Sequence, residues 1–302
     1  MSRIYDALQR ANLERKSSRD VNPAERAELF NASGIADQPP AREAIDLENI
    51  ALYPWNPSIS SLPTVGDRGE GIEQFRGLRS QFYEFRDQGP LKTILVSSGM
   101  PSEGKTFVAA NLAMSLARNQ NNNILIIDAD LRRPGLNRIL GAPNTPGLTE
   151  YLSGSADAQE ILQRNKNLRV VESGIMRSIP NLTYIPAGNG GDNSSELVAN
   201  HRIEELITTV SPHFDWILID SPPVLAFADA IDLARAADAV LLVIRAATTP
   251  FDVAQRAQAA FGNSRILGFV LNAVKNAPRN SSYYYGYHHY GKQDSGSKLQ
   301  EK

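Results

Sequence analysis

Six apolar runs, most of them rich in β-branched residues, divide the central part of the chain. They are KTILVSS (92–98), NILIID (123–128), LTYIPAG (182–188), DWILID (215–220), AVLLVIR (239–245) and ILGFVLN (266–272). Helical patterns lie between most of them, for example at 106–120, 195–210 and 228–237. Apolar strands that alternate with helices are typical of a parallel sheet covered on both faces. We therefore expect an α/β fold with a mostly parallel, doubly wound sheet.

The segment GMPSEGKT, which follows the first run, matches the pattern G-x-x-x-x-G-K-[ST] between a strand and a helix. Backbone N–H groups of such a loop converge on phosphates, and the helix N-terminus adds partial positive charge. Lys105 would supply charge to the β- and γ-phosphates, and Thr106 a hydroxyl to Mg²⁺. The sequence therefore predicts an ATP site of the P-loop type. Its candidate nucleotide-binding residues are Gly99, Pro101, Ser102, Glu103, Gly104, Lys105, Thr106 and Phe107.

Three carboxylates stand at the ends of two other runs. Asp128 and Asp130 follow NILII, and Asp220 ends DWILID. The carboxyl ends of strands form the ligand crevice in open α/β sheets. Three carboxylates beside a triphosphate cradle, with the Thr106 hydroxyl, therefore predict a Mg²⁺ site. Asn272 ends the last run, where it either reads the adenine edge or serves as a turn residue.

Composition excludes several classes of protein. The chain has 302 residues, a formal charge of −2 and no cysteine. It therefore lacks a basic field for nucleic acid, a disulfide framework and cysteine-ligated metals. No apolar run approaches the ~20 residues that cross a bilayer. We expect a soluble, cytoplasmic protein with no nucleic-acid partner.

The two ends differ from the centre. Residues 1–16 predict a short amphipathic helix, which docks on its own domain, on a protein partner or on a membrane surface. Its apolar stripe is short, which favours a protein partner over lipid. Residues 17–70 resemble a flexible linker, 71–276 a P-loop domain, and 277–302 a polar tail; we expect the N-terminal extension and the tail to be mobile. The tail holds five of the ten tyrosines: Tyr283, Tyr284, Tyr285, Tyr287 and Tyr290. Because this cluster has no aliphatic neighbours, the tyrosines are better candidates for modification than for a core.

From about Glu70 onward the chain resembles the bacterial tyrosine kinases of polysaccharide synthesis and export. The motifs SSGMPSEGKT, LIIDADLRRP and ILIDSPPVLAFADA carry the resemblance, in that order. So do the stretches GLTEYLSG, YIPAG and SSELV, the terminal tyrosines, and IEQFRGLR, in which Glu73, Arg76 and Arg79 have E-x-x-R-x-x-R spacing.

The resemblance implies a tyrosine autokinase that phosphorylates its tail between subunits. Lys105, Asp128, Asp130 and Asp220 would be its catalytic residues, with Asp128 orienting or deprotonating the acceptor hydroxyl. Thr106, Asp130 and Asp220 would hold the Mg²⁺. Glu73, Arg76 and Arg79 would join subunits into a ring. The partners it implies are a membrane-embedded polysaccharide co-polymerase that activates the kinase, through which the chain would reach the membrane, and a tyrosine phosphatase.

The chain departs from the family in two places, and two alternatives stay open. Ser102 replaces a frequent glycine, and residues 164–180 look like an insertion. A partition or positioning ATPase shares the fold, but such proteins usually carry a lysine where this chain has Met100. A scaffold that binds nucleotide without transferring phosphate is the third possibility.

Overall fold

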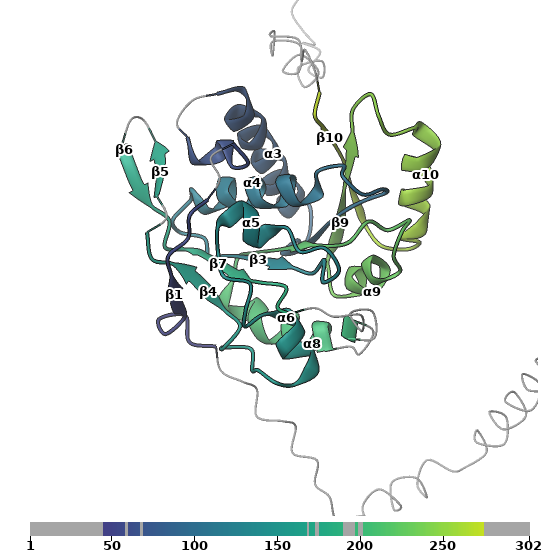
Figure 1. Ribbon diagram of the computed structural model, residues 1–302. Helices are drawn as coiled ribbons and strands as arrows, with labels where there is room; N and C mark the ends of the chain where they lie inside the picture. The colour runs from purple at the N-terminus through teal and green to yellow at the C-terminus, as the bar shows by residue number, and fades with distance from the viewer. Residues whose placement is uncertain are drawn as a thin grey trace, which may run out of the picture. The chain divides into compact units, whose positions relative to one another are not determined.

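The computed structural model describes residues 45–274, apart from 58–59, 67–68, 168, 173–174, 190–196 and 199–201 (Figure 1). All of them belong to the compact unit that begins at Glu43. The helix expected at residues 1–16 and the tail at 277–302 lie outside the described residues, as do residues 17–44 of the expected linker.

The core of the fold is an eight-stranded sheet with the order β1-β4-β7-β3-β8-β2-β9-β10. Its pairs are parallel except for β4 with β7. Each of the six apolar runs contains one of the strands, which confirms the expected α/β sheet. The strands are β1 (Ala51–Tyr53), β2 (Thr93–Ser98), β3 (Ile124–Asp128), β4 (Gln163–Asn165), β7 (Leu182–Ile185), β8 (Trp216–Asp220), β9 (Ala239–Arg245) and β10 (Ile266–Asn272).

Helices cover both faces of the sheet, as expected for parallel strands that are buried on both sides. Neighbouring residues of one strand point to opposite faces, so Ile94 packs in one core cluster and Leu95 in the other. One face carries α3 (Glu70–Asp87), α4 (Lys105–Ala117) and α5 (Leu136–Leu140), and the other α6 (Leu148–Ser153), α8 (Arg202–Val210), α9 (Asp229–Arg235) and α10 (Phe251–Ala260) (Figure 1). The short 3₁₀ helices are η1 (Pro63–Val65) and η2 (Ser211–His213).

The second half of the expected linker is part of the folded domain, which corrects the boundary at residue 70. Ile45, Ile50, Trp55 and Leu62 are buried, and β1 pairs with β4 at the edge of the sheet. The Trp55 ring packs edge-on against Tyr184, with centroids 5.9 Å apart. Three prolines and several Ser and Asn residues interrupt this stretch, and its apolar residues sustain no helical or strand period, so local pattern did not predict their burial.

The unassigned segment 164–180 contributes further strands. Its first residues complete β4, and β5 (Arg169–Glu172) and β6 (Ile175–Ser178) then form a separate antiparallel pair. Among the described residues, no helix combines the length and the apolar character that crossing a membrane would demand.

Candidate active site

The loop between β2 and α4 closes on itself through backbone and side-chain bonds. The Ser98 hydroxyl donates to the Met100 carbonyl at 2.8 Å, and the Met100 N–H donates to Glu103 Oε2 at 2.7 Å. Gly104 has a φ of 94°, and a Cβ there would lie 2.0 Å from Asn272 Nδ2. Glycine is therefore required, and α4 begins at the next residue with its free N–H groups facing the loop.

Ser102 also lies in the left-handed region, with a φ of 65°. A residue with a Cβ is uncommon there, whereas glycine adopts this conformation without a steric cost. The serine is thus more than a small change in a small-residue loop, because it adds backbone strain that its surroundings must hold.

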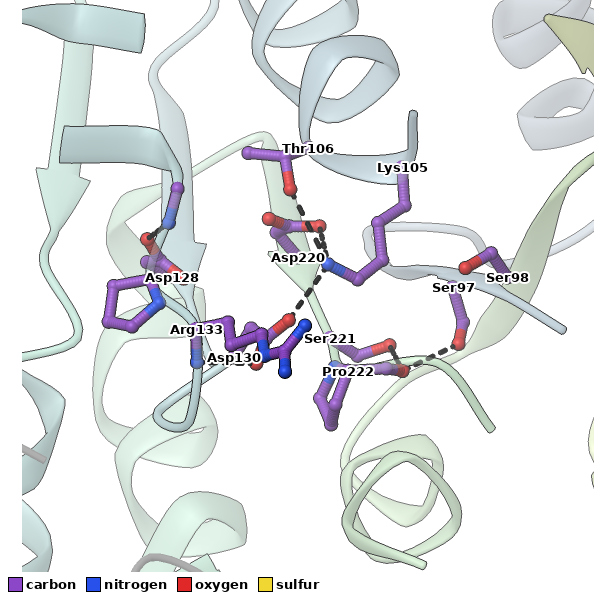
Figure 2. A network of polar contacts seen from close by, with 12 residues as sticks. Ser97, Ser98, Lys105, Thr106, Asp128, Asp130, Arg133, Asp220, Ser221 and Pro222 are labelled. Atoms are coloured by element: carbon purple, nitrogen blue, oxygen red, sulfur yellow. Dashed lines mark hydrogen bonds and ion pairs between the residues drawn. The ribbon is translucent and has the colours of Figure 1, made fainter. Parts of the chain in front are cut away.

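Lys105 is surrounded by acidic and hydroxyl oxygens (Figure 2). Its Nζ lies 2.9 Å from Asp130 Oδ2, 4.0 Å from Asp220 Oδ1 and 3.5 Å from Thr106 Oγ1. Burial by itself lowers the pKa of the ammonium group, but the carboxylates of Asp220 and Asp130 outweigh it and raise the pKa above its ordinary value. Lys105 is therefore charged and positioned at the carboxyl end of the sheet.

Asp128 is fully buried beneath this cluster. Its Oδ2 accepts hydrogen bonds from the N–H groups of Gly135 and Leu136, both at 3.0 Å, at the start of α5 (Figure 2). Burial raises the pKa of Asp128 to about 8, and the neighbouring Asp220 carboxylate adds to the effect. The bonds from the two amides act in the opposite direction but do not offset the burial.

Asp220 is the partner of Asp128 across the β3–β8 pair, so two acidic side chains end adjacent strands. Burial raises the pKa of Asp220 to about 6, while the Lys105 charge acts against this rise. Asp128 Oδ1 and both carboxylate oxygens of Asp220 are buried without a hydrogen-bond partner among the described residues. Buried oxygens left in this state indicate a ligand that supplies positive charge or donors.

The residues present fit a magnesium ion that is bound together with phosphate. Within the described part of the chain, no three Asp, Glu, His or Cys side chains gather in a geometry that would hold a metal by themselves. Mg²⁺ usually takes only one or two carboxylates and completes its shell with waters and substrate phosphates. The free oxygens of Asp220, beside Thr106 and Asp130, meet that requirement.

A cavity of about 540 Å³ opens above these groups. Its lining includes the predicted residues Pro101, Ser102, Lys105, Thr106 and Asp130. It also includes side chains that sequence reasoning did not single out, namely Arg133, Arg138 and Phe227. The loop, Lys105 and Asp130 therefore line one cavity, whereas Asp128 and Asp220 are fully buried and are not part of its lining.

Three residues expected at the nucleotide have their side chains engaged elsewhere. The Phe107 ring packs against Phe75, with centroids 5.9 Å apart, and lines a second cavity between α3 and β10. The Glu103 side chain is buried and bound to Met100 and Thr249. Asn272 Nδ2 donates to the Glu103 carbonyl at 2.9 Å, so its amide holds the loop in this state.

The E-x-x-R-x-x-R residues on α3 divide into two kinds. Glu73 and Arg76 form an exposed i,i+3 ion pair at 3.1 Å. Arg79 Nη1 donates to the Ser115 carbonyl at 2.7 Å, a group in the last turn of α4 that has no helical partner. Arg79 thus anchors α3 on α4 within the chain. The five tail tyrosines lie outside the described residues.

Arg132, the first arginine of the LRRP stretch, has a structural partner that the sequence did not reveal. Arg132 Nε lies 3.1 Å from Asp229 Oδ2, and its guanidinium stacks 4.6 Å from the centre of the Phe227 ring. The pair ties the loop after β3 to the start of α9 at the rim of the cavity. In the sequence, only the position of Arg132, two residues after Asp130, indicated that this residue lies near the site.

Comparisons with known proteins identify the family to which the chain belongs. The family of the AAA domain matches residues 91–254. The tyrosine-protein kinase YwqD of Bacillus subtilis is 33% identical over 71% of this chain and 86% of its own length. The tyrosine-protein kinase ptk of Acinetobacter johnsonii is 28% identical over 81% of this chain, which spans only 34% of that longer protein.

The fold comparison gives the same family. The kinase domain of the Escherichia coli tyrosine kinase ETK is 26% identical, with a TM-score of 0.59 over 75% of this chain and 80% of that domain. With the P-loop, the paired strand-end aspartates and these relatives together, the chain belongs to the bacterial tyrosine kinase family of P-loop NTPases.

Proposed function

We propose that this protein transfers the γ-phosphoryl group of ATP to tyrosine hydroxyls, with its own tail as the first substrate. The observation that carries the proposal is the convergence of Lys105, Asp128, Asp130 and Asp220 at the end of three adjacent strands, directly below a P-loop. Phosphoryl transfer requires mainly positioning and charge neutralisation, and these residues supply both.

Lys105 changes partners when nucleotide binds. In the described state its ammonium group is bound to Asp130 and lies near Asp220. In the nucleotide-bound state, the ammonium charge of Lys105 would pair with the β- and γ-phosphates instead of the two carboxylates. Mg²⁺, held by Thr106, Asp130 and Asp220, would supply the positive charge that these carboxylates lose. The ammonium keeps its charge throughout, because its pKa is raised.

Asp128 is suited to the acceptor hydroxyl rather than to the nucleotide. Two backbone amides fix its carboxylate through Oδ2, and Oδ1 is left without a partner. A tyrosine hydroxyl has a pKa of about 10, and burial raises the pKa of Asp128 to about 8. At neutral pH the nucleotide-free protein therefore holds a proton on Asp128. The positive charge of bound Mg²⁺ would favour the ionised carboxylate, which would then accept the tyrosine proton late in the transfer.

The tail would reach the site of a neighbouring subunit in a ring. Glu73 and Arg76 are exposed on α3 and available to a second copy, whereas Arg79 contributes through the position of the helix. We extend the proposal to regulation of polysaccharide synthesis and export, with a membrane co-polymerase as activator and a tyrosine phosphatase that resets the tail.

The test is incubation of the full chain with ATP and Mg²⁺, followed by mass spectrometry of the tail peptide. We expect phosphate on residues among Tyr283–Tyr290 and none in the Lys105→Met protein. An added tyrosine polymer serves as a second acceptor. Transfer to the polymer without tail phosphate would remove the tail as substrate, and nucleotide binding without transfer to either would support the scaffold alternative.

The partition ATPase is less well supported by the site. Its additional lysine would stand at residue 100, where this chain has an exposed methionine that cannot offer charge to a neighbour's phosphate.

A further inference from the structure

Glu103 is an acidic side chain buried in a loop that has to bind an anion. It is 3% exposed and does not line the nucleotide cavity. Its carboxylate repels phosphate at short range, and a buried charge is costly unless it is well bonded. Its presence therefore calls for a compensating role.

The contacts of Glu103 join three separate segments. Oε2 accepts the Met100 N–H at 2.7 Å, and Oε1 accepts the hydroxyl of Thr249, which lies between β9 and α10. The backbone carbonyl of Glu103 accepts Asn272 Nδ2 at 2.9 Å, from the end of β10. The loop is thus tied to the two outermost strands on its side of the sheet.

The partner segment is itself held in place. Thr249 Oγ1 accepts the Arg245 N–H at 3.2 Å, and Arg245 Nη1 donates to the Ser102 carbonyl at 3.2 Å. Residues 245 and 249 therefore both donate to the phosphate loop, one to a side-chain carboxylate and one to a backbone carbonyl. A side chain that merely filled space would not need acceptors for two donors from different segments.

This network encloses the two left-handed residues of the loop. Ser102 has a φ of 65° and Gly104 a φ of 94°, on either side of Glu103. Gly104 adopts this conformation without a steric cost, but Ser102 is strained, and strained backbone persists only where the surroundings over-determine it. Because the same turn sets where the N–H groups of residues 104–106 point, the restraint on Glu103 also sets the geometry offered to phosphate.

We propose that Glu103 is a positioning residue of the phosphate-binding loop, which it holds in its nucleotide-ready conformation through Thr249. It acts through the loop amides and does not contact phosphate itself. The inference rests on the proposed nucleotide site but not on phosphoryl transfer, so nucleotide binding alone can decide it.

The experiment measures ADP·Mg²⁺ and ATP·Mg²⁺ affinity by calorimetry, and KM and kcat where transfer occurs, for the full chain. Glu103→Ala should weaken binding about tenfold to a hundredfold, the range expected for lost bonds to a charged group. The KM for ATP should rise more than kcat falls, because the loop amides hold phosphate in both ground and transition states. Glu103→Gln keeps an acceptor for Met100 and should retain most of the affinity.

Thr249 provides a matched pair of variants. Thr249→Val removes the hydroxyl and should weaken binding by about tenfold or less, whereas Thr249→Ser should be close to wild type. Thr248→Val is the control, since that hydroxyl donates only to the Ala246 carbonyl in its own turn. The double variant Glu103→Ala with Thr249→Val should lose much less affinity than the sum of the two single losses, because both changes remove the same Glu103–Thr249 bond, and only the smaller bond from the Arg245 N–H to Thr249 is lost in addition.

Two results would overturn the proposal. One is an unchanged or tighter nucleotide affinity in Glu103→Ala, which would mean that the carboxylate does not support binding or opposes it. The other is a loss of melting temperature in the nucleotide-free protein without a change in affinity, which would make it a structural residue only. If the wild type binds nucleotide but transfers no phosphate, the kinase proposal fails while the affinity comparison still decides the role of Glu103.

Discussion

Replacing Asp128 by asparagine should make the nucleotide-free protein more stable and the enzyme less active. The carboxyl group is fully buried, and burial raises its pKa to about 8. The amide is close in size to a protonated carboxyl group. Its oxygen can accept the Gly135 and Leu136 N–H groups, as Asp128 Oδ2 does.

The sign of the effect follows from where the proton is bound. An aspartate in the unfolded chain titrates near pH 3.9, so between about pH 4 and pH 8 the folded state keeps a proton that the unfolded state has lost. The free energy of unfolding therefore falls as pH rises through this window, by up to about 1.4 kcal/mol per pH unit. By pH 7 the wild type has lost up to about 4 kcal/mol through this one group, and Asp128→Asn loses none of it.

The assay is urea unfolding at several values between pH 5 and pH 8, without nucleotide and with chelator present. Asp252→Asn is the control for the chemical change, because that carboxylate is 71% exposed and forms only a surface pair with Arg256. It should alter the stability by less than about 1 kcal/mol at any pH.

The same variant separates stability from chemistry. Asp128→Asn should lower phosphoryl transfer more than it lowers ATP affinity, since its proposed partner is the acceptor hydroxyl. A variant that is less stable than wild type at pH 7, or that has the same pH slope, would refute the reasoning about the buried proton. A collapse of nucleotide affinity in step with the rate would make Asp128 a metal ligand.

Three further changes test other parts of the site. Lys105→Met should abolish tail phosphorylation with the fold retained, as measured by phosphotyrosine mass spectrometry and circular dichroism; full phosphorylation would refute the site. Glu73→Ala with Arg76→Ala should reduce assembly size in light scattering without a loss of stability. Arg79→Ala should instead cost about 1 kcal/mol of unfolding free energy, through its lost bond to Ser115. Equal effects of the two changes on stability would contradict this division. Five tail phosphates would add roughly −8 to −10 in charge to a chain of formal charge −2, so the assembly should disperse most strongly at low salt, and an assembly that survives there would exclude electrostatic release.

Local sequence predicted the parts of this protein that depend on neighbours along the chain. The P-loop is one continuous segment, and its glycine is required by a φ of 94° at Gly104. The six strands were readable because each is an apolar run between polar segments. The placement of Asp128 and Asp220 at strand ends was readable for the same reason, because parallel strands bring their carboxyl ends to one edge.

Tertiary structure decided everything that joins distant segments. Glu103 and Thr249 are 146 residues apart, and Arg79 meets Ser115 across two helices. Residues 45–66 hold many apolar side chains, but prolines and polar residues interrupt them before any period is sustained, so their burial depends on a surface that other segments build. The raised pKa of Asp128 also comes from packing, since a carboxyl group titrates normally until the sheet and α5 exclude water from it. The sequence therefore determined which chemical groups this protein has, and the fold decided which of them meet, because such contacts depend on position in three dimensions.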